Sequence, residues 1–401
     1  MGSRARPLLF VWLMCVLSAA GCASRVEREA NLERQGNDTI RVWAYRWPAP
    51  VGGPEGNLAG IVAAFKSSHP GIRVEVTTLG HRSSGPAISR AIGIGEPPDL
   101  FIPPPGELAL YSRSLQVDLG PHLTAQDLGS YLPQSLDACR DDARLMALPR
   151  WIEGRAWICN PGPLLKAGIE PGRTSGWTWG QFESDCRALK ALGYTPAIID
   201  PSSPETLSAL GYKPALAVMS SPPAELVGSL YRQGLADPAI LGSPDHGTLD
   251  SFLRGRVGFA IGMNHALLGE VLRMRFTNGG SAPLLVPVPS SGVPGSPLRA
   301  GGIIVFRQVR YRGDDHTRLA VEFAKMISVA PPEPGLSPLL VPAYRPNLGD
   351  WTAFHRWNAV VALASVNNGT IQRLRTDADI HDALDIGAKA RRELKKGFSR
   401  P

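Results

Sequence analysis

Aromatic and charged side chains occur together in two short segments whose chemistry suits a sugar, residues 43–47 and residues 151–153. The flat face of an aromatic ring packs well against the apolar C–H faces of a sugar ring, while arginine and carboxylate groups hydrogen-bond hydroxyls. We therefore predict a ligand site to which both segments contribute. Its side chains are Trp43, Tyr45, Arg46, Trp47, Trp151 and Glu153.

Each tryptophan also has a structural interpretation, because large aromatic side chains are highly buried on average. We expect Trp157 and Trp179 to belong to the core. For Trp47 and Trp151 both interpretations stay open, because each is flanked by an arginine at the preceding position. Three arginines near these segments also keep an anionic ligand open: Arg46, Arg150 and Arg155.

Signatures of catalysis and cofactor binding are largely missing. The sequence has no Gly-x-Ser-x-Gly, no His-Glu-x-x-His and no Gly-Lys dipeptide, and its 8 histidines include no pair spaced to suit a metal. We therefore expect no cofactor, no metal and no catalytic residues. Carboxylates such as Asp99 and Glu153 leave a secreted carbohydrate-active enzyme open, since the sequence does not show whether two of them come together.

The charge balance argues against nucleic acid as a partner. The net charge of +7 falls to +5 without residues 1–21, which contain Arg4 and Arg6 and no acid. Elsewhere the basic residues are mostly interleaved with acidic ones, except in the tail from Lys389 to Arg400. A nucleic-acid-binding protein usually concentrates basic residues in a stripe or patch. We interpret the tail as a solvated helix face.

The amino terminus has the pattern of an export signal. Two arginines precede an apolar run from Leu8 to Leu17, which is followed by small residues and Cys22. A basic start, a short apolar core and small residues are typical of a secretory signal peptide. The segment ending at Cys22 resembles the bacterial lipobox, so we predict a signal peptide over 1–21, lipidation of Cys22 and a polar tether over 22–38. An ordinary signal peptide with a chance cysteine is the alternative.

Three further cysteines, Cys139, Cys159 and Cys186, form no Cys-x-x-Cys motif. An exported protein enters an oxidising compartment, which permits one disulfide among the three. Three buried thiols are at least as consistent with the sequence, so both states stay open.

The elements that must position these residues follow an α/β pattern. Residues 39–45 are predicted to form a strand, residues 58–65 a helix and residues 72–77 a second strand, so the two strands should be parallel. Thr178 and Gln181 fit a capping box at the start of another helix. Two more helices are predicted over residues 317–328 and 379–396.

Six segments of the sequence resemble, in order, the extracellular solute-binding proteins of ABC importers, in particular the carbohydrate-type family that includes maltose-binding protein. Each segment alone is degenerate, but six in the right order and at sensible spacing are specific. They are TIRVWAYRW, IVAAFKSSHPGIRVEV, GEPPDLFIPPPGELALYSRSLQVDLGPHL, LPRWIEGRAWICNPGPLLKAGIEP, FLRGRVGFAIGMNHAL and RAGGIIVF.

The resemblance implies two α/β lobes with a hinge and a ligand cleft between them. Lobe one would comprise residues 39–149 plus 300–330, and lobe two residues 150–299 plus 331–401. It adds Asn264 and His265 from lobe two to the predicted site, and Gly302 where the backbone would approach the ligand. Cys159, where the family usually has tyrosine, and Asn264–His265, in its usual tryptophan region, depart from the pattern and leave the particular sugar open.

The function implied is capture of a small solute, most simply a sugar or oligosaccharide, and its delivery to the transmembrane subunits of an ABC permease. A sugar phosphate or a polyamine is an alternative ligand. The same fold could instead serve a lipoprotein that senses a substrate or acts as a scaffold. We expect a monomer held at the cell envelope, facing the periplasm or the outer surface of the cytoplasmic membrane.

Overall fold

The computed structural model describes residues 39–46, 53–104, 108, 115–154, 156–171, 178–199, 228–237, 246–261, 268, 271, 283–289, 297–309, 314–331, 337–368 and 370–371. The predicted signal peptide, the tether and the helix over 379–396 lie outside these residues. Among the helices described, none combines the length and the apolar character needed to cross a membrane.

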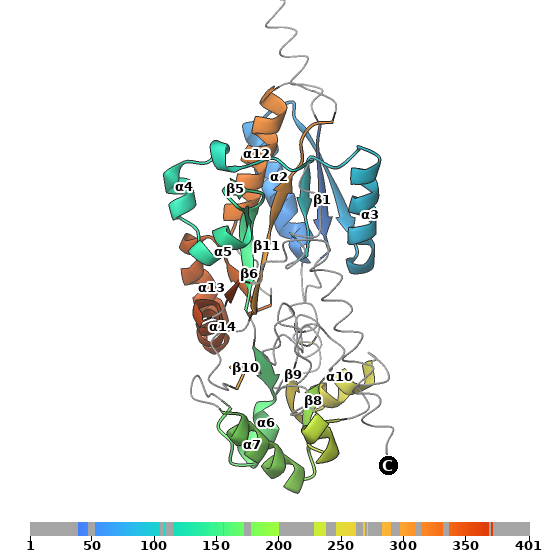
Figure 1. Ribbon diagram of the computed structural model, residues 1–401, viewed down its shortest axis with the longest axis vertical. Helices are drawn as coiled ribbons and strands as arrows, with labels where there is room; N and C mark the ends of the chain where they lie inside the picture. The colour runs from blue at the N-terminus through green and yellow to red at the C-terminus, as the bar shows by residue number, and fades with distance from the viewer. Residues whose placement is uncertain are drawn as a thin grey trace, which may run out of the picture.

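Seven strands form the first sheet, in the order β12-β6-β11-β3-β1-β2 with β13 paired to β11. The strands come from widely separated parts of the sequence, as the colours of Figure 1 show. Their bounds are β1 Thr39–Tyr45, β2 Arg73–Leu79, β3 Leu100–Ile102, β6 Leu148–Glu153, β11 Pro297–Val305, β12 Leu340–Pro342 and β13 Thr370–Ile371.

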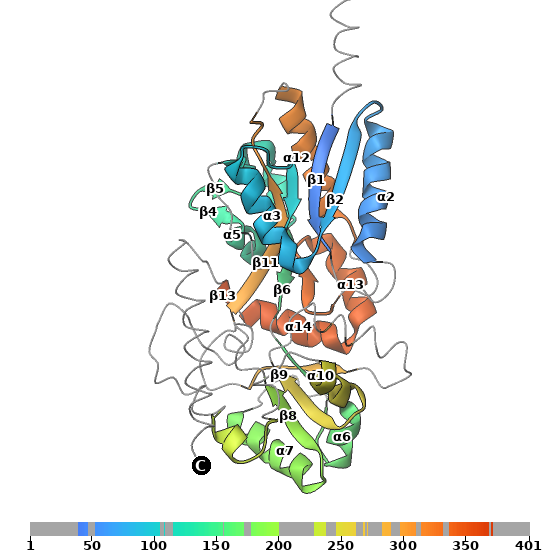
Figure 2. The same ribbon diagram turned by 90° about the vertical axis from the view of Figure 1, so that its right-hand side faces the viewer.

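The first three elements confirm the predicted β-α-β unit. β1 covers the predicted residues and pairs in parallel with β2, with Val42 opposite Val76. Helix α2, Gly53–Ser68, connects them, and its Leu58, Ile61 and Phe65 are buried against the sheet. The helical spacing of these apolar residues therefore marks the face that packs on the sheet. Helices α2 and α3, His81–Gly93, lie on opposite sides of β1 and β2 (Figure 2).

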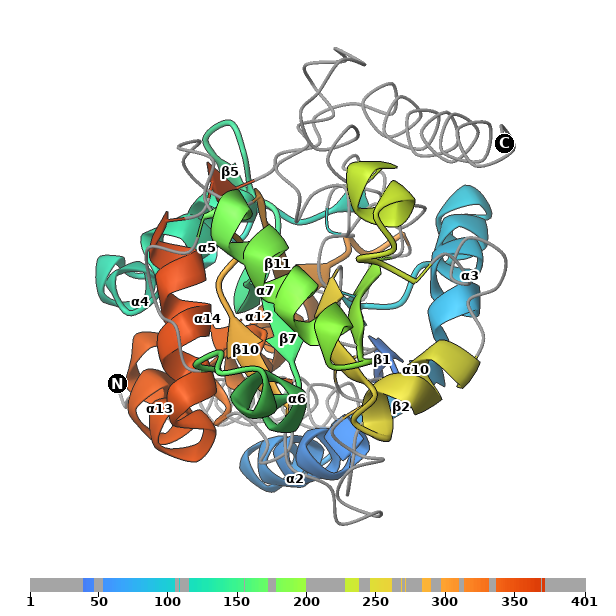
Figure 3. The same cartoon turned by 90° about the horizontal axis from the view of Figure 1, so that it is seen from below.

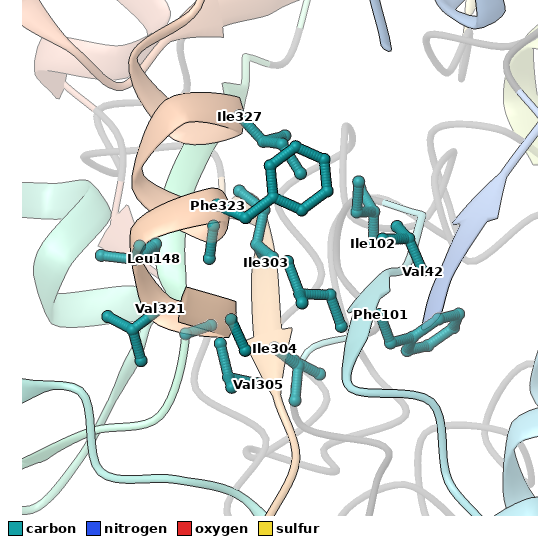
Figure 4. Packing of buried hydrophobic residues seen from close by; sticks show 14 of the residues in the cluster. Val42, Phe101, Ile102, Leu148, Ile303, Ile304, Val305, Val321, Phe323 and Ile327 are labelled. Carbon is teal, nitrogen blue, oxygen red and sulfur yellow. The ribbon is translucent and has the colours of Figure 1, made fainter. Parts of the chain in front are cut away.

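The core of the first sheet forms where α2 meets α12, Asp314–Val329, a helix that confirms the one predicted over 317–328. The two helices contact each other through Phe65 and Phe323, whose ring centroids are 4.6 Å apart. Figure 4 shows Phe323 and Ile327 of α12 packed over Ile303 of β11. All of these side chains are fully buried, so burial of apolar area fixes the helix on the sheet.

A second, four-stranded sheet has the order β10-β7-β9-β8. In β7, the Cα of Ile158 pairs with Ala260 of β9 and with Leu285 of β10, and both pairings are antiparallel. Strands β8 and β9 are parallel. Helices α6, α7 and α10 lie around this sheet (Figure 3). The bounds are β7 Trp157–Cys159, β8 Thr195–Ile199, β9 Val257–Ile261, β10 Leu284–Val286, α6 Pro161–Lys166, α7 Trp179–Ala191 and α10 His246–Leu253.

The capping box predicted at the start of α7 is present. Thr178 Oγ1 accepts a hydrogen bond from the Gln181 backbone N–H, and the Gln181 side chain accepts one from the Thr178 N–H. Trp157 is fully buried in the core of this sheet, as predicted. Trp179 is partly buried and packs edge-on against Trp157, with 5.4 Å between ring centroids.

Two helices, α13 Leu348–His355 and α14 Trp357–Asn368, lie beside both sheets, because α14 contacts β10 and β12. One buried cluster accordingly joins Ile152 of β6 and Val341 of β12 to Leu285 of β10. Four small elements, α4 Ala125–Gly129, α5 Pro133–Ala138, β4 Arg140–Asp141 and β5 Arg144–Leu145, lie between β3 and β6 in the sequence.

The sheet pairing differs in four places from the predicted division into lobes. The predicted boundary at residues 299 and 300 falls inside β11, and β13, which we assigned to lobe two, pairs with β11 in the first sheet. The predicted boundary at residues 149 and 150 falls inside β6, all of which belongs to the first sheet. Strand β12, which we assigned to lobe two, pairs with β6 in the first sheet. These differences arise because the pairing partners of β6, β11, β12 and β13 are distant in sequence. The exact lobe limits stay a prediction.

Cys139, Cys159 and Cys186 are all buried free thiols, so of the two states left open by the sequence, the structure shows the three thiols. Burial raises the pKa of Cys159 to about 12 and also raises that of Cys139 and Cys186. A thiol whose pKa is raised in this way is a poor nucleophile and reacts slowly.

Candidate functional site

The carboxyl ends of three strands meet at one edge of the first sheet. β3 is parallel to β1, and β11 is antiparallel to both β3 and β6, so β1, β3 and β6 run in the same direction. β6 leads directly into β7 of the second sheet through residues 154–156. This edge, which we call the facing edge, is therefore turned toward the second sheet (Figure 1).

The second sheet also turns carboxyl ends toward the facing edge. β7 starts there, and β9 and β10 run antiparallel to it, so Ile261 and Val286 lie at the same end as Trp157. β8 is parallel to β9, and its last residue, Ile199, pairs with Ile261. Ligands of open α/β sheets bind beyond the carboxyl ends of strands. The two sheets thus direct such ends at each other.

The structure brings two predicted site residues, Tyr45 and Trp151, into one buried cluster with Leu340 of β12. Tyr45 and Trp151 are each 3% exposed. The Arg150 guanidinium carbon lies 5.4 Å from the centre of the Trp151 ring, a cation–π contact. The two aromatic rings therefore support the facing edge from within the protein.

Arg46 and Glu153 lie at the facing edge with opposite exposure. Arg46 follows the last residue of β1, and its side chain is exposed while its backbone N–H donates to the Leu79 carbonyl at 2.8 Å. Glu153 is the last residue of β6 and is 1% exposed. Its Cα pairs with Arg299 of β11 on one side and Leu340 of β12 on the other. Among the predicted site residues that the structure describes, Arg46 is thus the best placed to meet a solute arriving from solvent.

Other predicted site residues lie elsewhere. Trp43 sits within β1, opposite Thr77 and Phe101, where it is partly buried against the first core. Trp47, Asn264 and His265 lie outside the described residues. Ile261, the last described residue before Asn264, ends β9.

Gly302 lies against the neighbouring strand. A Cβ atom built there would be 2.5 Å from the Leu148 carbonyl oxygen and 3.4 Å from the Pro149 Cα. β6 and β11 also shift register between Gly301 and Gly302. The close approach of these backbones is sufficient to require glycine, so the residue type is no argument for ligand contact.

Cys159, which departs from the family pattern, points into the second core, and its thiol lies 3.9 Å from the Pro171 carbonyl oxygen. The next residue, Asn160, is 1% exposed, and its side-chain amide donates to the carbonyls of Phe252 and Val257 at 2.8 and 2.7 Å. These bonds tie β7 to α10 and β9. The departure at position 159 is therefore a change in core packing.

Asp99 and Glu153, the carboxylates considered for glycoside hydrolysis, lie at opposite edges of the sheet. Asp99 precedes the first residue of β3, whereas Glu153 is the last residue of the parallel strand β6. The Asp99 carboxylate accepts from the Arg41 backbone N–H at 2.8 Å and contacts His316 Nε2 at 3.0 Å. Paired catalytic carboxylates flank a single bond, which these two residues cannot do.

No group of three or more histidine, cysteine, aspartate or glutamate residues that could hold a metal occurs within the described ranges. A site missed by the sequence prediction is a cavity of about 420 Å³ between α2, β1 and β2, lined in part by Tyr45 and Arg150. The signal for it was weak, because the lining residues come from five separate elements.

Two sheets, each with its own core and with carboxyl ends directed at each other, define a two-lobe binding protein of the periplasmic type. Residues 53–312 match the family described as bacterial extracellular solute-binding protein. The chain belongs to this family, as the sequence resemblance predicted. The family consists of exported binding proteins, which agrees with the export signal inferred at the amino terminus.

Solved structures with the same fold are distant in sequence. The sugar-binding protein MalE of Xanthomonas citri is 15% identical with a TM-score of 0.68, covering 90% of this chain and 92% of that one. The cyclic alpha-maltosyl-1,6-maltose binding protein of Arthrobacter globiformis is 14% identical with a TM-score of 0.67, covering 90% and 94%. An ABC substrate-binding protein of Listeria monocytogenes, solved with cycloalternan, is 16% identical with a TM-score of 0.64, covering 91% and 100%. A search of curated protein sequences finds no match.

Proposed function

We propose that the protein captures a sugar or oligosaccharide outside the cytoplasm and delivers it to the transmembrane subunits of an ABC permease. The observation that carries this proposal is the placement of Tyr45, Arg46, Trp151 and Glu153 at or directly beneath the facing edge, in a chain of the solute-binding family. The related proteins of Arthrobacter globiformis and Listeria monocytogenes bind cyclic maltosyl-maltose and cycloalternan, which supports a carbohydrate ligand here.

The mechanism is hinge closure. A solute between the lobes binds the closed arrangement more tightly than the open one. The difference between the two binding free energies is the amount by which the solute stabilises the closed arrangement. The connection from β6 to β7 is short, and the Gly154 backbone N–H donates to the Leu339 carbonyl at 2.7 Å. Motion is then concentrated in a few residues between two sheets that move as units. No covalent step takes place in this chain.

The membrane attachment is part of the same proposal. Lipidation of Cys22 would tether the body through residues 22–38, whose sequence is polar. A tethered monomer stays close to its permease at the outer surface of the membrane or in the periplasm. Mass spectrometry of the protein from the cell envelope tests this: the expected product starts at Cys22 and carries acyl chains, and a free thiol at that position would overturn the anchor.

Thermal unfolding of the chain from residue 22, with Cys22 replaced by serine, tests solute capture. The ligand panel contains maltose, malto-oligosaccharides, sugar phosphates and polyamines. A ligand at a hundred times its dissociation constant adds about 2.7 kcal/mol to the folded state and raises Tm by several degrees. A rise with a sugar supports the proposal, whereas a rise only with polyamines, or none with any sugar, contradicts it.

The exposure of each residue decides which variant reports on the site. Arg46→Ala removes an exposed side chain at the facing edge and should weaken sugar binding about tenfold with little change in Tm, since surface substitutions usually change stability by about 0.5 kcal/mol or less. Arg73→Ala is the matched control, because Arg73 is exposed at the amino end of the adjacent strand β2. Equal affinities in the two variants would remove Arg46 from the site.

A further inference from the structure

The cavity next to α2 extends along the first sheet, away from the facing edge. Its sheet wall includes Thr78, which pairs with Ala44, and Val74, which pairs with Ile40 farther along β1. Helix α2, which lies beside β2 in Figure 2, lines one side with Leu58, Ala59 and Val62. β2 is the last strand of the sheet, and its Val76 lines the cavity and is 41% exposed. A small molecule could therefore enter past β2.

Aliphatic side chains form most of the cavity wall. They come from β1, β2, β3 and α2 and are Ala44, Leu58, Ala59, Val62, Val74, Val76 and Ile102. Among the described lining residues, Tyr45, Thr78 and Arg150 add hydrogen-bonding groups. A bare sugar would leave several hydroxyls without partners on such a wall, and burying each costs free energy. An alkyl or aryl group loses nothing there and gains by leaving water.

Arg150 gives the cavity a positive charge. It lies in β6 and is 9% exposed, so its guanidinium is largely buried. In the strand order β6-β11-β3-β1-β2, Arg150 lines the cavity from the end of this series opposite to β2. Its stacking on Trp151 fixes the side chain in place. A guanidinium stays protonated and has five N–H donors, so it can bind a carboxylate, phosphate or sulfate in addition to its other partners. Buried charge-assisted hydrogen bonds of this kind are strong.

We propose that this cavity, which begins at Tyr45 beneath the facing edge and extends along α2 and β2, is a binding site for an amphipathic anion. The ligand consists of an aliphatic or aryl group that fills the space between α2 and β2 and an acidic group that binds Arg150. The volume of about 420 Å³ lies within the range of small-molecule pockets and holds roughly a dozen non-hydrogen atoms, at about 30 Å³ for each water-sized group. The site does not depend on sugar capture.

Isothermal titration calorimetry with four probes tests the proposal on the chain from residue 22, with Cys22 replaced by serine. The probes are octanoate, octyl sulfate, 1-octanol and acetate, each well below the concentration at which it forms micelles. Octanoate and octyl sulfate should bind at one site, at least tenfold more tightly than 1-octanol, and acetate should not bind. Octanoate that binds no more tightly than 1-octanol, or at many equivalent sites, overturns the proposal.

Two variants of α2 form a matched pair. Ala59 lines the cavity and is exposed, so Ala59→Leu places three extra carbon atoms in the space and should weaken octanoate binding at least tenfold. Ala63, one turn along the same helix, is exposed and does not line the cavity, so Ala63→Leu should leave the affinity unchanged. Equal affinities in both variants overturn the site.

Arg150→Met tests the charge. It keeps an apolar side chain of similar length and should reduce octanoate affinity to that of 1-octanol while leaving 1-octanol binding unchanged. Retained preference for the anion contradicts the role of Arg150. If this variant fails to fold, the comparison of Ala59→Leu with Ala63→Leu still tests whether the cavity binds octanoate. Because the sugar panel is measured separately, loss of this site leaves the proposed sugar capture standing, and the reverse also holds.

Discussion

Gly302 offers a direct test of how the strand that carries Arg150, Trp151 and Glu153 is held. In Gly302→Ala the new Cβ would lie 2.5 Å from the Leu148 carbonyl oxygen and 3.2 Å from its carbon. The first distance is roughly 1 Å short of van der Waals contact, and the neighbour is backbone rather than a flexible side chain. We expect a loss of about 1–3 kcal/mol in the free energy of unfolding, the usual cost of overpacking.

The matched control is Gly60→Ala in α2. A Cβ at Gly60 meets nothing within 4 Å, and alanine in a helix interior is more stable than glycine by about 0.5–1 kcal/mol. The same chemical change should therefore act in opposite directions at the two positions. Urea denaturation followed by tryptophan fluorescence measures both, without ligand.

The refuting result is a denaturation midpoint for Gly302→Ala equal to that of the unsubstituted protein. It would show that β6 and β11 are not packed as closely as described. A normal midpoint combined with lost sugar binding would instead return Gly302 to the role first predicted for it, at the ligand.

Three further predictions concern buried groups. Trp151→Ala should destabilise the protein by about 3–5 kcal/mol, because a large buried ring is removed; a small loss by thermal unfolding would contradict its burial. Ser328→Ala should cost about 1–3 kcal/mol, because the Ser328 hydroxyl donates to the Pro149 carbonyl at 2.6 Å and accepts from Tyr131 at 2.8 Å; Tyr131→Phe, which keeps the first bond, should cost less. Burial lowers the pKa of His355 to about 4. Between about pH 6.5 and 4 the folded state therefore binds fewer protons than the unfolded state. The free energy of unfolding should fall by on the order of 3 kcal/mol as the pH falls through that range. His355→Phe should show a weaker loss in denaturation midpoints at pH 7 and pH 4.

Local patterns were sufficient to predict the elements built from neighbouring residues. Ile40 and Val42 alternate along β1, Leu58 and Phe65 recur at helical spacing in α2, and Thr178 and Gln181 are three positions apart. Each of these signals lies within one element, so sequence alone defines it. The parallel pairing of β1 and β2 followed because a helix joins them.

Pairings between distant segments could not be read in the same way. β12 has only three residues, Leu340–Pro342, which is too short for a periodic pattern, and its partner β6 lies almost two hundred positions earlier. The assignment of residues 331–401 to lobe two therefore differed from the sheet pairing. The requirement for glycine at position 302 likewise arises from the Leu148 carbonyl, which no local pattern reveals.

The candidate site was predicted only in part, because the exposure of its side chains depends on strands that are distant in sequence. Sequence identified Tyr45 and Trp151 as aromatic residues near strand ends, and the structure places them in one cluster. It did not show that both would be almost fully buried, nor that Trp43, two residues before Tyr45, packs on the core in mid-strand. Residue type indicates what a side chain can bind, whereas exposure depends on which strands lie beside it.

The order of strands in the first sheet has a consequence for biosynthesis. Strand β11 separates β3 from β6 in the sheet, yet in the sequence it follows both and starts only at residue 297. A chain emerging from the ribosome thus contains β1, β3 and β6 long before the strand that must join them, and closing so long a loop is slow. The first sheet lacks β11 until about three quarters of the chain has been made, and β12 and β13 follow later still. Since the chain belongs to a family of extracellular proteins, we expect such a delay to favour an incompletely folded chain while export begins.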